Sequence, residues 1–179
     1  MDRYRAFLTG EPGCGKTTVV TRVCENLVAT GFRLGGMISR EVRQRGIRVG
    51  FSLEDVLTHE NGILAHVDQK DGPRIGKYRV NLRDLERIGA AAIARAARNS
   101  DLVIVDEIGP MELHSMPFIL AVRTALASPR DIVGTIHKRA THSLVTEIKS
   151  NVAYEILEVT QQNRDLLPVA ISEKISRKK

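Results

Sequence analysis

Short apolar runs alternate with amphipathic stretches along most of this chain. The apolar runs predict buried strands at residues 4–9, 101–105, 131–136 and 153–159. Apolar positions spaced by three or four residues predict helices at residues 16–29, 82–98, 116–127 and 141–149, with a closing helix in the basic segment 163–179. Strands that alternate with helices require crossover connections. The pattern therefore predicts an α/β fold with a mostly parallel central sheet and helices on both faces.

Residues 36–80 depart from this alternation. Two strand-like runs, 37–42 and 47–53, flank a short polar turn and predict a hairpin. Weaker strand signals follow at residues 63–67 and 78–80. We interpret the segment as an antiparallel strand insertion within the larger sheet.

The length and composition favour one globular domain. The chain has 179 residues, of which 42% are hydrophobic and 27% charged, and it contains no repeat or low-complexity linker. We therefore expect a single domain over residues 1–179. The longest apolar runs, such as residues 102–105, are far too short to span a membrane, and no signal-peptide core follows the N-terminus. We expect a cytoplasmic monomer with no membrane partner.

The charge balance favours anionic partners, but it does not separate nucleotides from nucleic acids or from simple solubility. Lys and Arg number 27 against 21 Asp and Glu, which gives a formal net charge of +6. Trp is absent and aromatic residues are few, which argues against a stacking platform for single-stranded nucleic acid. Nucleotides are the anions that the motifs below favour.

Residues 10–17 match the phosphate-binding loop (P-loop) pattern G-x-x-x-x-G-K-[ST], between a predicted strand and a predicted helix. Its glycines let backbone N–H groups approach phosphate oxygens, and the helix N-terminus adds its dipole. Lys16 would contact the β- and γ-phosphates as a catalytic cation, and the Thr17 hydroxyl would bind Mg²⁺. The dinucleotide pattern G-x-G-x-x-G fails, because Thr18 replaces its last glycine. The expected nucleotide contacts here are Gly10, Glu11, Pro12, Gly13, Cys14, Gly15, Lys16, Thr17 and Thr18.

Cys14 invites a redox interpretation, because a thiol near a helix N-terminus can have a lowered pKa. It occupies a variable position of the loop, however, and the second cysteine, Cys24, lies about 15 Å away if both belong to one helix. We therefore favour a chain with reduced cysteines and no redox function.

A second acidic motif follows the most apolar strand. Asp106 and Glu107 come directly after residues 101–105. At the carboxyl end of a parallel strand, Asp106 would reach the Mg²⁺ shell, and Glu107 would orient a water and accept its proton. The alternative is that both acids only cap the backbone of the next loop. His137 ends a further predicted strand and could contact the γ-phosphate, although an exposed loop histidine is the interpretation we favour. The remaining histidines have no metal-ligand spacing.

Five segments together resemble the thermophile-type nucleoside-triphosphatases, whose animal relatives are called cancer-related nucleoside-triphosphatases. They are GEPGCGKTT, GIRVGFSLED, IGKYRV, DLVIVDEIGPMEL and TQQNRDLLP, and the resemblance runs from residue 5 to about residue 168. The P-loop is shared with many families. The residues 106–109 followed by Met111 and Glu112 are far more specific.

This resemblance implies a RecA-like P-loop fold with added strands, and Mg²⁺-dependent hydrolysis of ATP, GTP and other nucleoside triphosphates. It places Thr17 and Asp106 at Mg²⁺, Glu107 at the attacking water, and Asn163 and Arg164 beside the base or ribose. Pro110 departs from a family position that is often polar or basic, so we assign no transition-state cation there. The second nucleotide-contacting segment would comprise Leu102, Val103, Ile104, Val105, Asp106, Glu107, Ile108 and Gly109.

Two other functions remain open at this point. A nucleotide or small-molecule kinase can share the P-loop pattern, and Arg74, Lys77 and Arg83 could then serve a lid over the acceptor. The adjacent Glu107 argues against it. A nucleic-acid-dependent ATPase is suggested by the net charge of +6, and the scarcity of aromatic residues argues against that.

Overall fold

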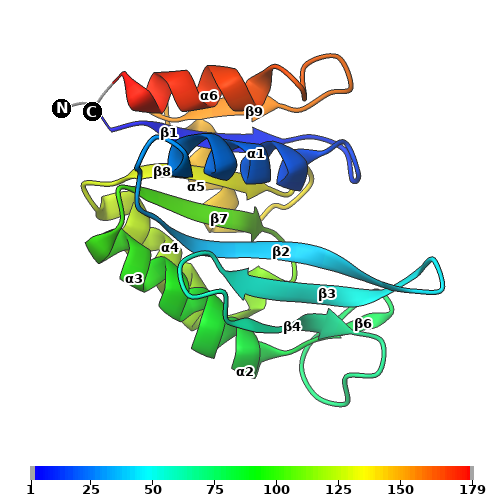
Figure 1. Cartoon of the computed structure of the whole chain (residues 1–179). Coiled ribbons are helices and arrows are strands. Elements are labelled where there is room, and N and C mark those ends of the chain that lie inside the picture. Colours follow the sequence, from blue (N-terminus) through cyan, green and yellow to red (C-terminus); the bar gives the residue numbers. More distant parts are fainter. Residues whose placement is uncertain (1–2, 178–179) are drawn as a thin grey trace.

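The computed structural model describes residues 3–177, and the strands of this part of the chain form a single sheet (Figure 1). The spatial order is β5-β6-β4-β3-β2-β7-β8-β1-β9. The strands are β1 (Arg5–Thr9), β2 (Leu34–Gln44), β3 (Ile47–Asp55), β4 (Asn61–His66), β5 (Arg74–Ile75), β6 (Tyr78–Val80), β7 (Leu102–Ile108), β8 (Asp131–Ile136) and β9 (Glu155–Glu158).

The sheet has a parallel half and an antiparallel half. Strands β2, β7, β8, β1 and β9 pair in parallel, so their carboxyl ends share one edge of the sheet. Strands β3, β4, β6 and β5 continue the sheet from β2 in antiparallel pairings. Both the mostly parallel central sheet and the antiparallel addition expected from the sequence are confirmed.

Helices cover both faces of the sheet and enclose two hydrophobic cores. Helices α1 and α6 contribute to one core, whereas α3, α4 and α5 contribute to the other. No helix within residues 3–177 combines the length and apolarity needed to cross a membrane. The helices are α1 (Lys16–Val28), α2 (Leu82–Asp84), α3 (Ala91–Asn99), α4 (Met116–Ala127), α5 (Ser143–Ser150) and α6 (Leu167–Ser176), with a π-helical turn at Leu85–Ala90 and a 3₁₀ turn at Glu112–His114.

Strand β7 is buried on both faces, which is typical of a strand inside a parallel sheet. Val103 and Val105 belong to the core beneath α3 and α4, and Leu102 and Ile104 belong to the core beneath α1 and α6. This alternation fixes the register of the strand. The same register places Asp106 near the carboxyl end of the strand.

Several boundaries differ from those expected. The hairpin has a two-residue turn, Arg45 and Gly46, in which both residues have positive φ, and its strands extend beyond the predicted runs. The first part of β2, residues 34–38, already pairs in parallel with β7. The closing helix begins at Leu167, because residues 161–166 form turns that Asn163 stabilises. The two-residue strand β5 was not predicted.

Candidate functional site

The P-loop connects β1 to α1 and has the backbone that only glycine allows. Gly10, Gly13 and Gly15 have φ values of 145°, 78° and 108°. A Cβ on Gly10 would lie 2.7 Å from the Val159 carbonyl oxygen and 2.8 Å from Cys14 Sγ. Gly13 has open space where a Cβ would stand. The loop therefore has the positive-φ glycines expected of an anion-binding concavity at a helix N-terminus.

Asp106 brings the acidic strand end to the P-loop. Its side chain is 1% exposed, and Oδ1 accepts a 2.6 Å hydrogen bond from the Thr135 hydroxyl on β8. Burial raises the pKa of Asp106 to about 6, while hydrogen bonding by Thr135 and Thr17 and the charge of Lys16 oppose that rise. Two P-loop side chains therefore act directly on a carboxyl group that lies about ninety residues away in sequence.

The residues at this point suit a hard divalent cation. Asp106 Oδ2 is buried and has no hydrogen-bonding partner among the described residues. The Thr17 hydroxyl hydrogen-bonds to the same carboxyl group and favours its charged form. Oxygen donors of these kinds are the ligands that Mg²⁺ uses together with substrate phosphates. No cluster of three or more His, Cys, Asp or Glu within residues 3–177 could hold a metal by itself. The arrangement fits an ion that is bound jointly by protein and triphosphate.

Glu107 follows through a cis peptide bond and is partly buried beside the same loop. Its Oε1 is buried without a hydrogen-bonding partner in the described part of the chain. Burial raises the pKa of Glu107, and the charge of Lys16 lowers it. An unpartnered carboxylate oxygen near Lys16 can accept a hydrogen bond from a water at that position.

Glu112 is a buried acid whose environment the sequence did not reveal. It lies in the 3₁₀ turn after β7, is 4% exposed, and its Oε2 accepts a 3.2 Å hydrogen bond from the Gly109 N–H. Burial, together with the nearby charge of Glu107, raises the pKa of Glu112 to about 8. Its position in a segment that folds back on the strand end could only be recognised from the tertiary structure.

His137 begins the loop that follows β8 and is half-buried there. Its N–H donates to the Ile108 carbonyl oxygen at 3.1 Å, and its Cβ lies 3.5 Å from the position that a Cβ on Gly109 would occupy. Partial burial lowers the pKa of His137, and the charge of Lys16 lowers it further. The expected exposure of this loop histidine is therefore wrong, and its contact with the γ-phosphate stays a prediction.

A cavity of about 220 Å³ borders the P-loop at Gly15 and Thr18. Arg164 Cδ lies 3.5 Å from the position of a Cβ on Gly15, and Arg22 forms a 2.7 Å ion pair with Asp165 across the cavity wall. Sequence reasoning assigned no role to Arg22 and Asp165, because no motif indicates that their two segments lie side by side. The lining residues are Gly15, Thr18, Val19, Arg22, Arg164 and Asp165.

Asn163 stabilises the loop that carries Arg164. Its Oδ1 accepts from the Thr160 N–H at 2.8 Å, and its Nδ2 donates to the Glu158 carbonyl oxygen at 2.8 Å. A contact between Asn163 and the base stays a prediction. The same holds for residues 102–105 and Ile108, whose side chains fill the two cores. Asp106 and Glu107, in contrast, lie close enough to Lys16 for its charge to lower their pKa.

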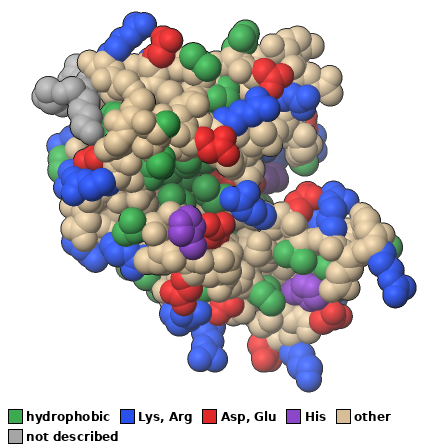
Figure 2. Space-filling model, in the orientation of Figure 1, with side chains coloured by type: hydrophobic (Ala, Val, Ile, Leu, Met, Phe, Trp, Pro, Cys, Tyr) green, Lys and Arg blue, Asp and Glu red, His purple; other side chains and the backbone are tan. Residues whose placement is uncertain are grey.

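The site lies at the edge of the sheet where the parallel strands end. Figure 2 shows a notch at the right of the view, in the region where Figure 1 places the carboxyl ends of β1 and β7. Basic and acidic side chains surround this notch. Ligands of open α/β sheets bind in the crevice at these strand ends.

The chain matches the NTPase family model over residues 5–172. Nucleoside-triphosphatase THEP1 from Thermofilum pendens is 46% identical over 171 residues, covering 95% of this chain and 94% of the relative. The protein of the same name from Methanosarcina acetivorans is 46% identical over 175 residues, covering 97% and 98%. These matches extend over nearly the full length of both partners.

Two solved structures have the same fold. The crystal structure of THEP1 from Aquifex aeolicus aligns with a TM-score of 0.86 at 33% identity, covering 96% of this chain and 98% of that one. The solution structure of a human cancer-related nucleoside triphosphatase aligns with a TM-score of 0.81 at 33% identity, covering 99% of each chain. With a matching family model, similar relatives and a shared fold, this chain belongs to the NTPase family.

Proposed function

We propose that the protein hydrolyses nucleoside 5′-triphosphates, ATP and GTP among them, to the diphosphate and phosphate in a Mg²⁺-dependent reaction. The observation that carries this proposal is the meeting of Lys16 and Thr17 with Asp106 and Glu107 at one edge of the sheet. The names of the relatives agree with it. The cytoplasm, where these nucleotides are abundant, is the proposed compartment.

In this proposal each residue has a distinct task. The P-loop N–H groups and Lys16 bind the β- and γ-phosphates. Thr17 and Asp106 would hold Mg²⁺, which when bound neutralises developing charge on the phosphates. Glu107 orients a water and accepts its proton. The buried surroundings of these acids strengthen their electrostatic interactions with the substrate.

The kinase alternative gains no support from the position of its expected lid residues. Arg74 and Lys77 lie in the β5–β6 region, where Lys77 Nζ donates to the Arg48 carbonyl oxygen, and Arg83 lies in α2, which follows β6. Six strand spacings separate β6 from β1 in the sheet order, which corresponds to about 29 Å. These residues are therefore remote from the P-loop strand.

A panel of phosphate-release assays tests the proposal. Purified protein is incubated with Mg²⁺ and ATP, GTP, CTP or UTP, with and without nucleoside monophosphates or nucleic acid. We expect phosphate release in every triphosphate reaction, and a loss of roughly 10² or more with Lys16→Ala, because the variant lacks the cation at the β- and γ-phosphates. Transfer to a monophosphate that outpaces transfer to water would contradict hydrolysis as the function. So would wild-type release no faster than that of Lys16→Ala.

A further inference from the structure

The loop after β8 carries two adjacent basic residues that reach the P-loop. Lys138 Nζ lies 3.0 Å from Glu11 Oε1, and Arg139 Nη2 lies 3.8 Å from Glu11 Oε2. Glu11 is the second residue of the P-loop. A carboxylate at the lip of the phosphate-binding loop therefore pairs with both basic residues of this loop, which we call the basic loop (residues 137–142).

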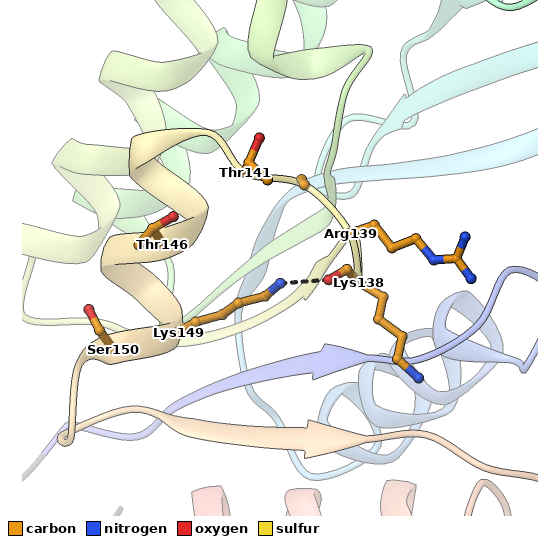
Figure 3. A pocket seen from close by; sticks show the side chains of 7 residues that line it. Lys138, Arg139, Thr141, Thr146, Lys149 and Ser150 are labelled. Carbon is orange, nitrogen blue, oxygen red and sulfur yellow. Dashed lines mark hydrogen bonds between the residues drawn. The ribbon is translucent and has the colours of Figure 1, made fainter.

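The two basic side chains differ in how firmly they are held. Lys138 also pairs with Glu158 Oε1 at 2.8 Å, and its carbonyl oxygen accepts a 2.8 Å hydrogen bond from Lys149 Nζ on α5. Figure 3 shows this second contact and shows Arg139 pointing away from Lys138. The Arg139 side chain is 81% exposed, and within residues 3–177 its ion pair is the 3.8 Å contact with Glu11. Lys138 therefore anchors the loop, whereas the Arg139 guanidinium can move.

The basic loop also adjoins the residues that carry the reaction. The Arg139 N–H donates to His137 Nδ1 at 3.3 Å, and His137 lies against Gly109 next to Glu107. The positive charges of Lys16 and Arg139 both lower the pKa of His137. The loop borders an open cavity of about 510 Å³, so packing does not confine the arginine. Arg139 thus contacts the lip of the P-loop through its side chain and the half-buried His137 through its backbone N–H.

Hydrolysis of a triphosphate redistributes negative charge over the γ-phosphate oxygens, and a cationic side chain there can add to the stabilisation by Lys16, the P-loop N–H groups and Mg²⁺. A guanidinium offers two parallel N–H donors to phosphate oxygens, which an ammonium does not. Pro110, which follows Gly109 in the sequence, has no charge with which to stabilise the phosphates. Arg139 is an exposed guanidinium at the lip of the P-loop, so it can supply such a cation.

We propose that Arg139 is a catalytic residue that stabilises the transition state, and that Glu11 holds it at the lip when no triphosphate is bound. The inference rests on the proposed hydrolase function. In the reaction, the water oxygen bonds to the γ-phosphorus as the bond to the β,γ-bridging oxygen breaks. That oxygen leaves with the electron pair on the diphosphate, and the water proton passes to Glu107. Arg139 donates to the γ-phosphate oxygens while this exchange takes place.

Arg139→Ala and Arg139→Lys test the assignment against Arg177→Ala. Arg177 is a matched control, because it is 78% exposed, has one carboxylate partner in the described chain, Glu173, and lies at the far end of α6. We expect kcat to fall by roughly 10²–10³ in Arg139→Ala, with ADP affinity within about threefold of wild type. Arg139→Lys should recover only part of the rate, and Arg177→Ala should match wild type.

Binding of ADP with aluminium fluoride, a planar mimic of the transferred phosphoryl group, separates the possible results. We expect wild type to bind this pair more tightly than ADP alone, and Arg139→Ala to lose that gain while still binding ADP. A wild type without phosphate release would contradict the proposed function itself. An active wild type with Arg139→Ala within threefold of it would overturn only the role of Arg139. A loss seen in Lys138→Ala but not in Arg139→Ala would likewise overturn it.

Glu11→Gln tests the holding role separately. This variant lacks the charge that competes with phosphate for the basic loop, so we expect ATP to bind a few-fold more tightly. Weaker binding than wild type would contradict competition between Glu11 and the triphosphate.

Discussion

Three acidic side chains, Asp106, Glu107 and Glu112, follow one another within seven residues, and burial raises the pKa of each. They are not equivalent. Asp106 receives hydrogen bonds from two threonines and the field of Lys16, which favour its charged form. Glu112 lies close to the charge of Glu107, which favours its neutral form. The segment thus combines carboxylates suited to binding a cation with a carboxyl group that keeps its proton near neutral pH.

The protonation of Glu112 makes a prediction about stability. Its pKa of about 8 lies above the value of about 4.3 for an unfolded chain, so the folded protein holds an extra proton between these values. The contribution of Glu112 to stability should therefore be complete below about pH 4 and be lost progressively as pH rises toward 8. Glu112→Gln cannot lose that proton. We expect the nucleotide-free Tm of the variant to gain several degrees on wild type between pH 5 and pH 8.

An exposed acid provides the control for this measurement. Glu173→Gln on α6 removes a carboxylate that is more than half exposed and pairs with Arg177. Its Tm should follow the wild type at each pH. A constant difference between Glu112→Gln and wild type over the whole range would show that Glu112 is ionised in the folded protein, contrary to this account.

Residues in local motifs could be predicted, whereas residues gathered by the fold could not. The spacing of Gly10, Lys16 and Thr17 encodes a loop whose backbone serves phosphate, so the motif specifies its own geometry. Asp165 and Glu112 lie in segments that resemble the family, but that resemblance assigned neither residue a place at the site. Their placement depends on loops that return to the site from other parts of the sheet.

At the scale of elements, β2 joins the parallel and antiparallel halves of the sheet, and two of its glycines lie where neighbouring elements approach closely. Gly35 faces α3, where a Cβ would lie 2.9 Å from Ala96 Cβ. Gly36 has a φ of 117°, and a Cβ there would collide with the Ile104 backbone on β7. The two glycines allow β2 to approach both the helix and the strand beside it.

Gly36→Ala is expected to lower the free energy of unfolding by about 3 kcal/mol or more, because strain at positive φ adds to a clash with backbone that cannot move away. Chemical denaturation measures this change. Gly76→Ala is the matched control: its φ of 58° is also positive, but a Cβ there has no atom within 4 Å. It should cost about 1–2 kcal/mol. Equal losses in the two variants would contradict the close approach of β2 to β7.

Long elements with clear periodicity were predicted, and short or irregular ones were not. The bounds of α4 and β8 match the predicted runs. Strand β5 has two residues, too few to show any alternation. The start of α6 was placed too early, because the hydrogen bonds of Asn163 close a turn that periodicity does not register.

At the scale of the whole molecule, the sheet order creates the site. Strand β8 lies between β1 and β7, and the hydroxyl of its Thr135 donates a hydrogen bond to Asp106 on the neighbouring β7. The crossover rules predict that parallel strands share one carboxyl edge. They do not predict which strands become neighbours, because that depends on pairings between distant segments. The meeting of the P-loop with Asp106 was therefore expected, but the strand that joins them was not.

Parallel measurement of nucleotide affinity and turnover in Glu107→Gln tests the central claim most directly. Glutamine keeps the shape of the side chain but cannot accept the proton of the attacking water. We expect ATP affinity to stay within a few-fold of wild type while phosphate release falls by roughly 10²–10⁴. Wild-type turnover in this variant, or loss of binding equal to the loss of turnover, would contradict a hydrolytic site in which Glu107 acts on water beside the P-loop.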